Sequence, residues 1–174
     1  ITMVASSNGS IRVIVCKSKS SGVVYVTVAI NVFPAPPVPN DFIKIAGIPT
    51  ICLTDNSSVF TAYGNDEGWD SPFKKLMADH HFCYRDCLFI FSVGGGTEET
   101  SACLVRAVDY AKGMYGSVLG VVGKDSGHTA KHGDAVIVVP QTHPSRVTPH
   151  SESFQLVFTH LLVNALAKKG EWEE

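Results

Sequence analysis

The chain has 174 residues, a length that fits one domain with a single hydrophobic core. Hydrophobic residues make up 45% of it and charged residues 17%, so the composition excludes an intrinsically disordered chain. The formal net charge is -2 with acidic and basic residues interspersed, which excludes a broad positive surface for nucleic acid.

Short apolar runs rich in β-branched residues recur along the chain and predict strands that are buried on both faces. Helix-compatible segments lie between the later runs, at 70–82, 98–112 and 150–169. Strands that alternate with helices predict βαβ units, a mostly parallel sheet and right-handed crossovers. The apolar runs are 11–16, 23–30, 49–54, 87–93, 117–123 and 134–140.

The segment NVFPAPPVPN, residues 31–40, interrupts this pattern. Its prolines remove backbone donors and fix φ, so an ordinary helix is not expected from Pro34 to Pro39. The apolar run before it, residues 23–33, is about half as long as a membrane-spanning helix requires, and we expect no membrane partner. No internal repeat or flexible linker divides the chain, and we expect residues 1–174 to form one domain.

The loop SVGGGT, residues 92–97, joins a predicted strand to a predicted helix. In a parallel α/β sheet, ligands bind beyond the carboxyl ends of the strands, where the next helix presents free N–H groups. Hydroxyls at Ser92 and Thr97 and three glycines suit a phosphate at this place. Glu99 breaks the G-x-G-x-x-G pattern, and no P-loop occurs. The loop therefore predicts either an anion site of another kind or a turn without a ligand.

The cysteines and histidines predict little further chemistry by themselves. Five cysteines are an odd number, and three lie in or beside apolar runs, which indicates a reducing, cytoplasmic setting. The segment HHFCYRDC, residues 80–87, contains potential metal ligands but no second ligand pair at zinc-site spacing. His128 and His132 are four residues apart, a spacing that favours a solvated short helix over a site. His143 and His150 flank the loop before the last predicted helix.

Four motifs are more specific together than each is alone: YGNDEG at 63–68, SVGGGT at 92–97, VGKDSG at 122–127, and a final helix that carries Glu152 and His160. With them, residues 40–168 resemble the sugar isomerase (SIS) domain in its phosphoheptose isomerase branch. The resemblance implies an α/β fold, a three-layer αβα sandwich of flavodoxin-like type with a mostly parallel sheet. It also implies a small-molecule phosphosugar as ligand.

The resemblance implies the roles of individual residues as well. Asp41 falls where the family carries its catalytic acid, and His160 falls on the histidine of proton transfer. Glu152 falls on a polar residue that helps to hold zinc in some members, so zinc at Asp41, Glu152 and His160 is the implied cofactor. The implied substrate and phosphate contacts are Asn65, Asp66, Ser92, Gly94, Gly95, Thr97 and Glu152.

The family's reaction interconverts sedoheptulose 7-phosphate and D-glycero-D-manno-heptose 7-phosphate through an enediol. Such an aldose–ketose isomerase needs a base within reach of a carbon beside the carbonyl and an acid that protonates the oxygen. A carboxylate and an imidazole can divide this work. A phosphate held away from the reacting carbons adds binding energy that positions them.

Residues 1–40 depart from the family pattern, whereas residues 41–174 follow it. CKSKSSG at 16–22 stands where the family has Gly-Asn-Gly-Gly-Ser, and Pro37 stands where it has a histidine. A diverged or reading-frame-disrupted N-terminal part explains this mismatch. The alternative function is therefore a non-catalytic phosphosugar-binding SIS module with a regulatory or assembly role. Because family sites are built between subunits, we expect a homo-oligomer, a dimer or a tetramer.

Overall fold

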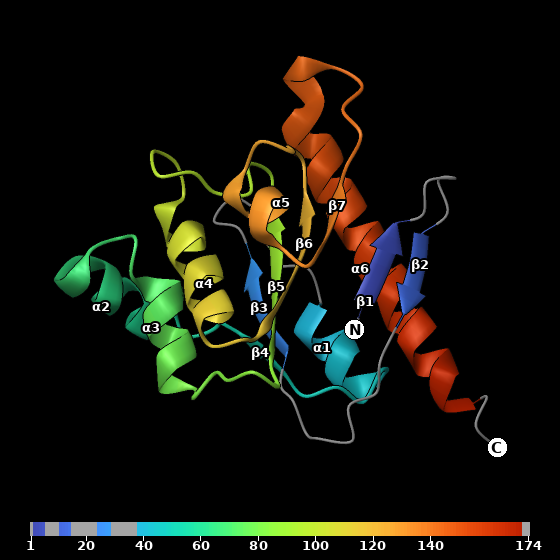
Figure 1. Cartoon of the computed structure of the whole chain (residues 1–174), viewed down its shortest axis with the longest axis horizontal. Coiled ribbons are helices and arrows are strands. Elements are labelled where there is room, and N and C mark those ends of the chain that lie inside the picture. The colour runs from blue at the N-terminus through green and yellow to red at the C-terminus, as the bar shows by residue number, and fades with distance from the viewer. Residues whose placement is uncertain (1, 6–10, 15–23, 29–37, 172–174) are drawn as a thin grey trace.

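The computed structural model describes residues 2–5, 11–14, 24–28 and 38–171 (Figure 1). The predictions for the CKSKSSG loop and for Pro34, Pro36 and Pro37 lie outside these residues. The main sheet has five parallel strands in the order β4-β3-β5-β6-β7. Its strands are β3 (Val24–Val28), β4 (Thr50–Cys52), β5 (Cys87–Ser92), β6 (Ser117–Val122) and β7 (Ala135–Val138).

This strand order is that of a flavodoxin-like sheet, and it confirms the predicted fold class. The chain runs from β3 to the edge strand β4, returns past β3 to β5, and then continues outward through β6 and β7. The direction of winding therefore changes between β3 and β5. In open α/β sheets this switch point, at the carboxyl ends of the strands, is where ligands bind.

The first apolar run was expected to join the main sheet, but it does not. Residues Ile11–Ile14 form β2, which pairs antiparallel with β1 (Thr2–Ala5) in a separate two-stranded sheet. An antiparallel partner close in sequence needs only a short connection, whereas a parallel one needs a long crossover. The apolar pattern predicted a strand here but could not identify its partner.

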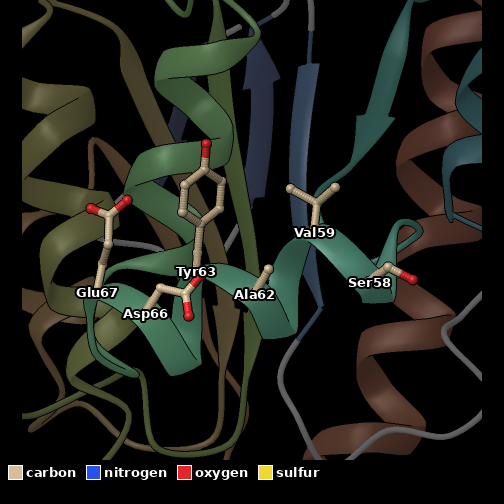
Figure 2. A pocket seen from close by; sticks show the side chains of 6 residues that line it. All are labelled: Ser58, Val59, Ala62, Tyr63, Asp66 and Glu67. Carbon is tan, nitrogen blue, oxygen red and sulfur yellow. The ribbon is translucent and has the colours of Figure 1, made fainter.

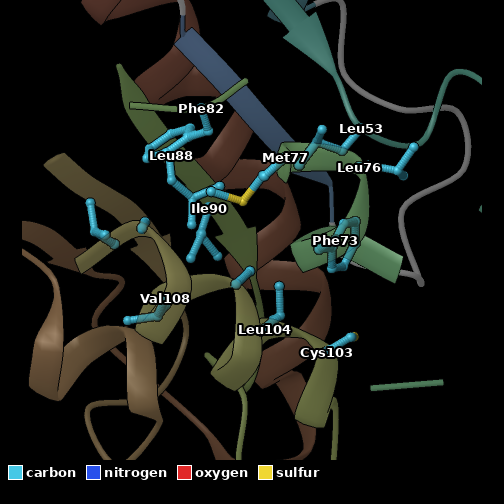
Figure 3. Close-up of a cluster of buried hydrophobic side chains, with 13 residues drawn as sticks. Leu53, Phe73, Leu76, Met77, Phe82, Leu88, Ile90, Cys103, Leu104 and Val108 are labelled. Atoms are coloured by element: carbon cyan, nitrogen blue, oxygen red, sulfur yellow. The ribbon is translucent and has the colours of Figure 1, made fainter. Parts of the chain in front are cut away.

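Helices cover both faces of the main sheet, as a three-layer sandwich requires (Figure 1). On one face, α1 (Val38–Lys44) and α6 (Val147–Glu171) pack over Phe89 and Phe91 of β5. On the other, α3 (Pro72–Asp79) and α4 (Ala102–Gly113) pack over Leu88 and Ile90, with α2 (Ser57–Glu67) outside α3 (Figure 3). α5 (His128–His132) lies against β6 and β7, and the 3-10 turn η1 (Pro144–Arg146) precedes α6.

The burial of β5 on both faces explains why its sequence is apolar without alternation. All six of its residues are buried, because successive side chains point to the two opposite helix layers. Figure 3 shows Leu88 and Ile90 among side chains of α3 and α4, including Met77 and Leu104. The strand thus connects both halves of the core.

The predicted helices exist, but several of their bounds differ. The prediction at 70–82 is confirmed by α3, and α6 begins three residues before the predicted 150. α4 begins at Ala102 instead of 98, because Thr97 and Thr100 hydrogen-bond each other in a turn. α1 begins at Val38, so the expectation of no helix is wrong at Pro39, which sits in the first turn, where no intrahelical N–H bond is lost.

Within the described ranges, no helix combines the length and the apolarity that crossing a bilayer demands.

Candidate active site

The two predicted catalytic residues lie side by side in the structure. Nδ1 of His160 is 3.3 Å from Oδ2 of Asp41. The Asp41 side chain is 13% exposed and that of His160 is 50% exposed. The contact becomes an ion pair when the imidazole is protonated, and the half-exposed ring leaves the histidine accessible to a ligand.

Packing of the two helices fixes this contact. Phe42, beside Asp41 on α1, is 1% exposed and packs edge-on against Phe89 of β5. On α6, Thr159 and Leu162 are buried on either side of His160. These anchors hold α1 and α6 against the same face of the sheet, so the polar pair forms at the boundary of the two helices.

Glu152 lies on α6 two turns before His160, about 12 Å along the helix axis. Its Oε1 is buried and has no hydrogen-bond partner among the described residues. A buried carboxylate oxygen is normally paired, so this position suits a polar ligand group or a cation. Its neighbour Ser151 is buried close to Gly123, which places Glu152 near the carboxyl ends of the strands.

The implied zinc set is not assembled in this structure. Across the described residues, no three His, Cys, Asp or Glu side chains are grouped so that they could hold a metal ion. Asp41 and His160 meet, whereas Glu152 stands apart from them. The described residues therefore do not fit a preformed three-ligand centre.

The glycine loop is held by bonds within the protein. Ser92 is 4% exposed, and its Oγ accepts a hydrogen bond from the Gly95 N–H at 3.0 Å. Thr97 accepts from the Thr100 N–H through Oγ1 and donates its own N–H to the Thr100 carbonyl. The hydroxyl protons of Ser92 and Thr97 remain able to donate to an anion.

The fold requires glycine at two of the three glycine positions in the loop. Gly95 and Gly96 have φ of +73° and +81°, a left-handed conformation that other residues seldom adopt. A Cβ on Gly96 would also lie 2.9 Å from Leu104. Gly94 has neither a left-handed φ nor any atom within 4 Å of a Cβ. The fold alone does not require a glycine there, which is consistent with a backbone that a ligand approaches closely.

The sequence did not single out Arg106, which connects the loop to the α2–α3 turn. Its guanidinium makes two bonds to the Glu98 carboxylate, at 3.0 and 2.8 Å, and one to Asp70 at 3.3 Å. The bond to Glu98 is the main cause that raises the pKa of Arg106. A single arginine within a helix has no sequence pattern that predicts this contact.

Asn65 and Asp66 lie away from the Asp41–His160 pair. Both are exposed near the end of α2, and Asp66 helps to line a shallow hollow of about 280 Å³ along that helix (Figure 2). In Figure 1, α2 lies at one end of the molecule and α6 at the other. Within one copy of the chain, the structure does not bring this predicted substrate-contacting pair to the catalytic pair.

The remaining histidines make local contacts. His143 accepts from the Ser145 N–H and caps η1, and His150 lies 3.3 Å from the Thr142 hydroxyl at the start of α6. Nε2 of His128 lies 2.7 Å from Asp109, and its ring stacks on that of His132 at 4.1 Å. The segment 80–87 connects α3 to β5, as its sequence predicted.

Comparisons with known proteins find similar sequences and similar folds. The lincomycin biosynthesis protein LmbN of Streptomyces lincolnensis is 33% identical over 135 residues, 73% of this chain and 49% of LmbN. The phosphoheptose isomerase of Rhodospirillum rubrum is 33% identical over 117 residues, 67% of this chain and 57% of that protein. The solved phosphoheptose isomerase of Neisseria gonorrhoeae matches with a TM-score of 0.65 at 23% identity, covering 82% of this chain and 76% of that one. No protein-family model matches the chain.

The chain therefore has the fold of the sugar isomerase (SIS) proteins. In sequence it is similar to curated phosphoheptose isomerases, at 33% identity to that of Rhodospirillum rubrum and 30% to that of Sulfurimonas denitrificans. It spans only 49% of the length of LmbN and 57% of the length of the Rhodospirillum rubrum protein.

Proposed function

We propose that the protein is an aldose–ketose isomerase acting on a phosphosugar, with sedoheptulose 7-phosphate as its substrate and D-glycero-D-manno-heptose 7-phosphate as its product. The observation that carries this proposal is the Asp41–His160 contact of 3.3 Å. These two residues come from separate helices and are far apart in sequence. They are also the two that family resemblance assigns to proton transfer.

In the proposed reaction, the Asp41 carboxylate removes a proton from C1 of the ketose while protonated His160 donates to the oxygen on C2. This gives an enediol. Neutral His160 then takes the proton from the oxygen on C1, and Asp41 returns its proton to C2, which yields the aldose. Both residues end in their starting states, so the cycle needs no external proton donor.

The glycine loop would hold the phosphate of this substrate. It follows β5 at the switch point of the sheet, where a parallel α/β fold places its ligands. The hydroxyls of Ser92 and Thr97 supply donors, and Gly94 allows close approach of the backbone. Phosphate binding there would add orientation and affinity without touching the reacting carbons.

We also propose that the working protein is a homo-oligomer. His160 lies on a helix whose exposed side includes Phe154, Val157 and Leu161. A helix that is apolar on its exposed as well as its buried face is usually covered on both. A second copy of the chain would cover this face and could bring its own Asn65 and Asp66 to the site.

Proton exchange tests the proposed reaction directly. The chain is incubated with sedoheptulose 7-phosphate in heavy water, and the sugar's C1 and C2 protons are followed by NMR. We expect deuterium uptake that falls at least a hundredfold in Asp41→Asn and in His160→Asn, roughly the contribution of one general acid or base. Asp79→Asn and His81→Asn, which change the same residue types in and just after α3 on the opposite face of the sheet, serve as matched controls.

Uptake that survives in both active-site variants would exclude the assigned roles. No uptake by the wild-type chain, together with sugar resonances that broaden on binding and sharpen when inorganic phosphate competes, would support the non-catalytic phosphosugar-binding module instead.

A further inference from the structure

The glycine loop is held in place by a residue from another part of the chain. Thr129, on α5, is 0% exposed, and both its N–H and its hydroxyl donate to the Gly95 carbonyl, at 2.9 and 2.8 Å. The N–H of the preceding residue, His128, donates to the Gly96 carbonyl at 2.7 Å. Two successive carbonyls of the loop are thus bound by the start of one short helix.

These bonds fix the conformation of Gly95 from two sides. Its N–H donates to Ser92 Oγ, and its carbonyl accepts from Thr129. Both backbone groups of Gly95 are therefore used inside the protein, at a residue whose φ of +73° is left-handed. Gly95 acts as the fixed point of the loop, and ligand contacts are left to its neighbours, in contrast to the phosphate contact that the resemblance implied for Gly95.

The position of Thr129 is itself well determined. Its methyl group faces β6, where a Cβ added to Gly120 would lie 2.9 Å from Thr129 Cγ2. The loop before α5 also packs directly on the glycine loop, because a Cβ on Gly127 would lie 2.1 Å from the Gly94 carbonyl oxygen. Any shift of Thr129 would therefore be transmitted to the loop.

We propose that Thr129 is a positioning residue for phosphate binding. Its buried hydroxyl never reaches the ligand but keeps the loop in the conformation that binds the phosphate, and its removal weakens phosphosugar binding. This inference rests on the proposed function of the loop. A preorganised loop binds more tightly because less of the binding free energy is lost in ordering it.

The experiment measures binding and exchange separately. Thr129→Val keeps the shape of the side chain and removes the hydroxyl, whereas Thr129→Ser keeps the hydroxyl. We expect the Val variant to bind sedoheptulose 7-phosphate about fivefold more weakly by calorimetry, the usual effect of losing one hydrogen bond. Its deuterium exchange rate at saturating sugar should match the wild type, with only KM raised, and the Ser variant should restore tight binding.

Thr50→Val is the matched control, because Thr50 is also a buried threonine whose hydroxyl donates to a carbonyl, at the opposite edge of the sheet. We expect it to bind as the wild type does. If Thr129→Val does not fold, Thr129→Ala provides the variant without a hydroxyl.

Equal binding by the wild type and the variants without a hydroxyl would overturn the inference, and so would a Ser variant as weak as Val. Weak binding by Thr50→Val would overturn it too, because the effect would then be general. These results leave the proposed function standing. Failure of the wild-type chain to bind the sugar would overturn both, whereas binding without exchange would overturn only the isomerase activity.

Discussion

At the scale of single residues, burial controls the chemistry of the cysteines. Cys87 begins β5 in the centre of the sheet, and desolvation raises its pKa from 9.0 to about 12. Burial also raises the pKa of Cys52 and Cys103. The thiolate is the reactive form, so these three thiols should be inert near neutral pH. For Cys52 and Cys87 the sequence predicted apolar surroundings correctly, since they lie in the hydrophobic runs 49–54 and 87–93, whereas Cys103 is buried by the packing of α4.

The raised pKa of Cys87 predicts how the free energy of unfolding depends on pH. The folded protein keeps the thiol proton up to about pH 12, whereas the unfolded chain loses it above 9.0. The stabilisation that the protonated Cys87 thiol gives is therefore complete below pH 9.0, and it is lost as the pH rises through the folded-state pKa. Relative to Cys87→Ala, the wild-type free energy of unfolding should fall by up to about 1.4 kcal/mol for each pH unit in this window.

Urea denaturation with a reductant at pH 8 and pH 10 would measure this difference. The cavity left by Cys87→Ala costs the same at both pH values, so only the change with pH matters. Parallel pH profiles for the two proteins would show that the thiol ionises alike in the folded and unfolded states.

At the scale of elements, local patterns predicted what each segment forms better than which segment it meets. Continuous apolar runs predicted β5 and β6 correctly, because strands covered on both faces need no polar positions. β2 was assigned to the wrong sheet, since apolarity does not identify a partner. α2 was not predicted, because its Val59 and Ala62 are exposed and give no clear apolar stripe.

The same limit applies to predicting the candidate site from the sequence. Asp41 and His160 were paired only through family resemblance, since nothing local links a helix near residue 40 to one near residue 160. The glycine loop was predicted from its own residues, but its support by Thr129 comes from a crossing of two loops that are 34 residues apart. Long-range contacts of this kind depend on topology, which a single sequence does not display.

The crossing of these loops leads to a prediction at Gly127. A Cβ there would lie 2.1 Å from the Gly94 carbonyl oxygen and 2.8 Å from Gly95 Cα. Both are backbone atoms, so Gly127→Ala must displace the glycine loop. We expect a loss of roughly 1–3 kcal/mol in the free energy of unfolding, as for other overpacked sites, together with at least tenfold weaker phosphosugar binding.

Gly113→Ala is the appropriate comparison, because a Cβ at this helical position meets nothing within 4 Å. It should leave binding unchanged and raise stability by about 0.5–1 kcal/mol. Thermal unfolding and calorimetric titration would measure both quantities. Wild-type binding in Gly127→Ala would mean that the loop tolerates displacement.

At the scale of the whole molecule, the separation of α2 from α6 determines how a site could be completed. Asn65 and Asp66 lie on α2, whereas His160 lies on α6 at the other end of the molecule (Figure 1). α6, which carries His160, also has exposed apolar side chains. If the proposed oligomer is correct, two copies contribute different residues to one site.

Mixing two inactive variants tests this arrangement. Asp41→Asn and Asp66→Ala chains are prepared separately, shown to be inactive in proton exchange, and then unfolded and refolded together. If Asp41 and Asp66 act across copies, each hybrid dimer contains one intact site and one doubly altered site. Random assembly would then restore about a quarter of wild-type activity, because half of the dimers are hybrids with one working site each.

If both residues act within one copy, every chain in the mixture carries a defect and no activity returns. Sedimentation at several protein concentrations would show whether hybrids can form at all. A chain that stays monomeric but catalyses exchange would exclude a shared site, and it would require α2 to reach the Asp41–His160 pair by a rearrangement within one copy.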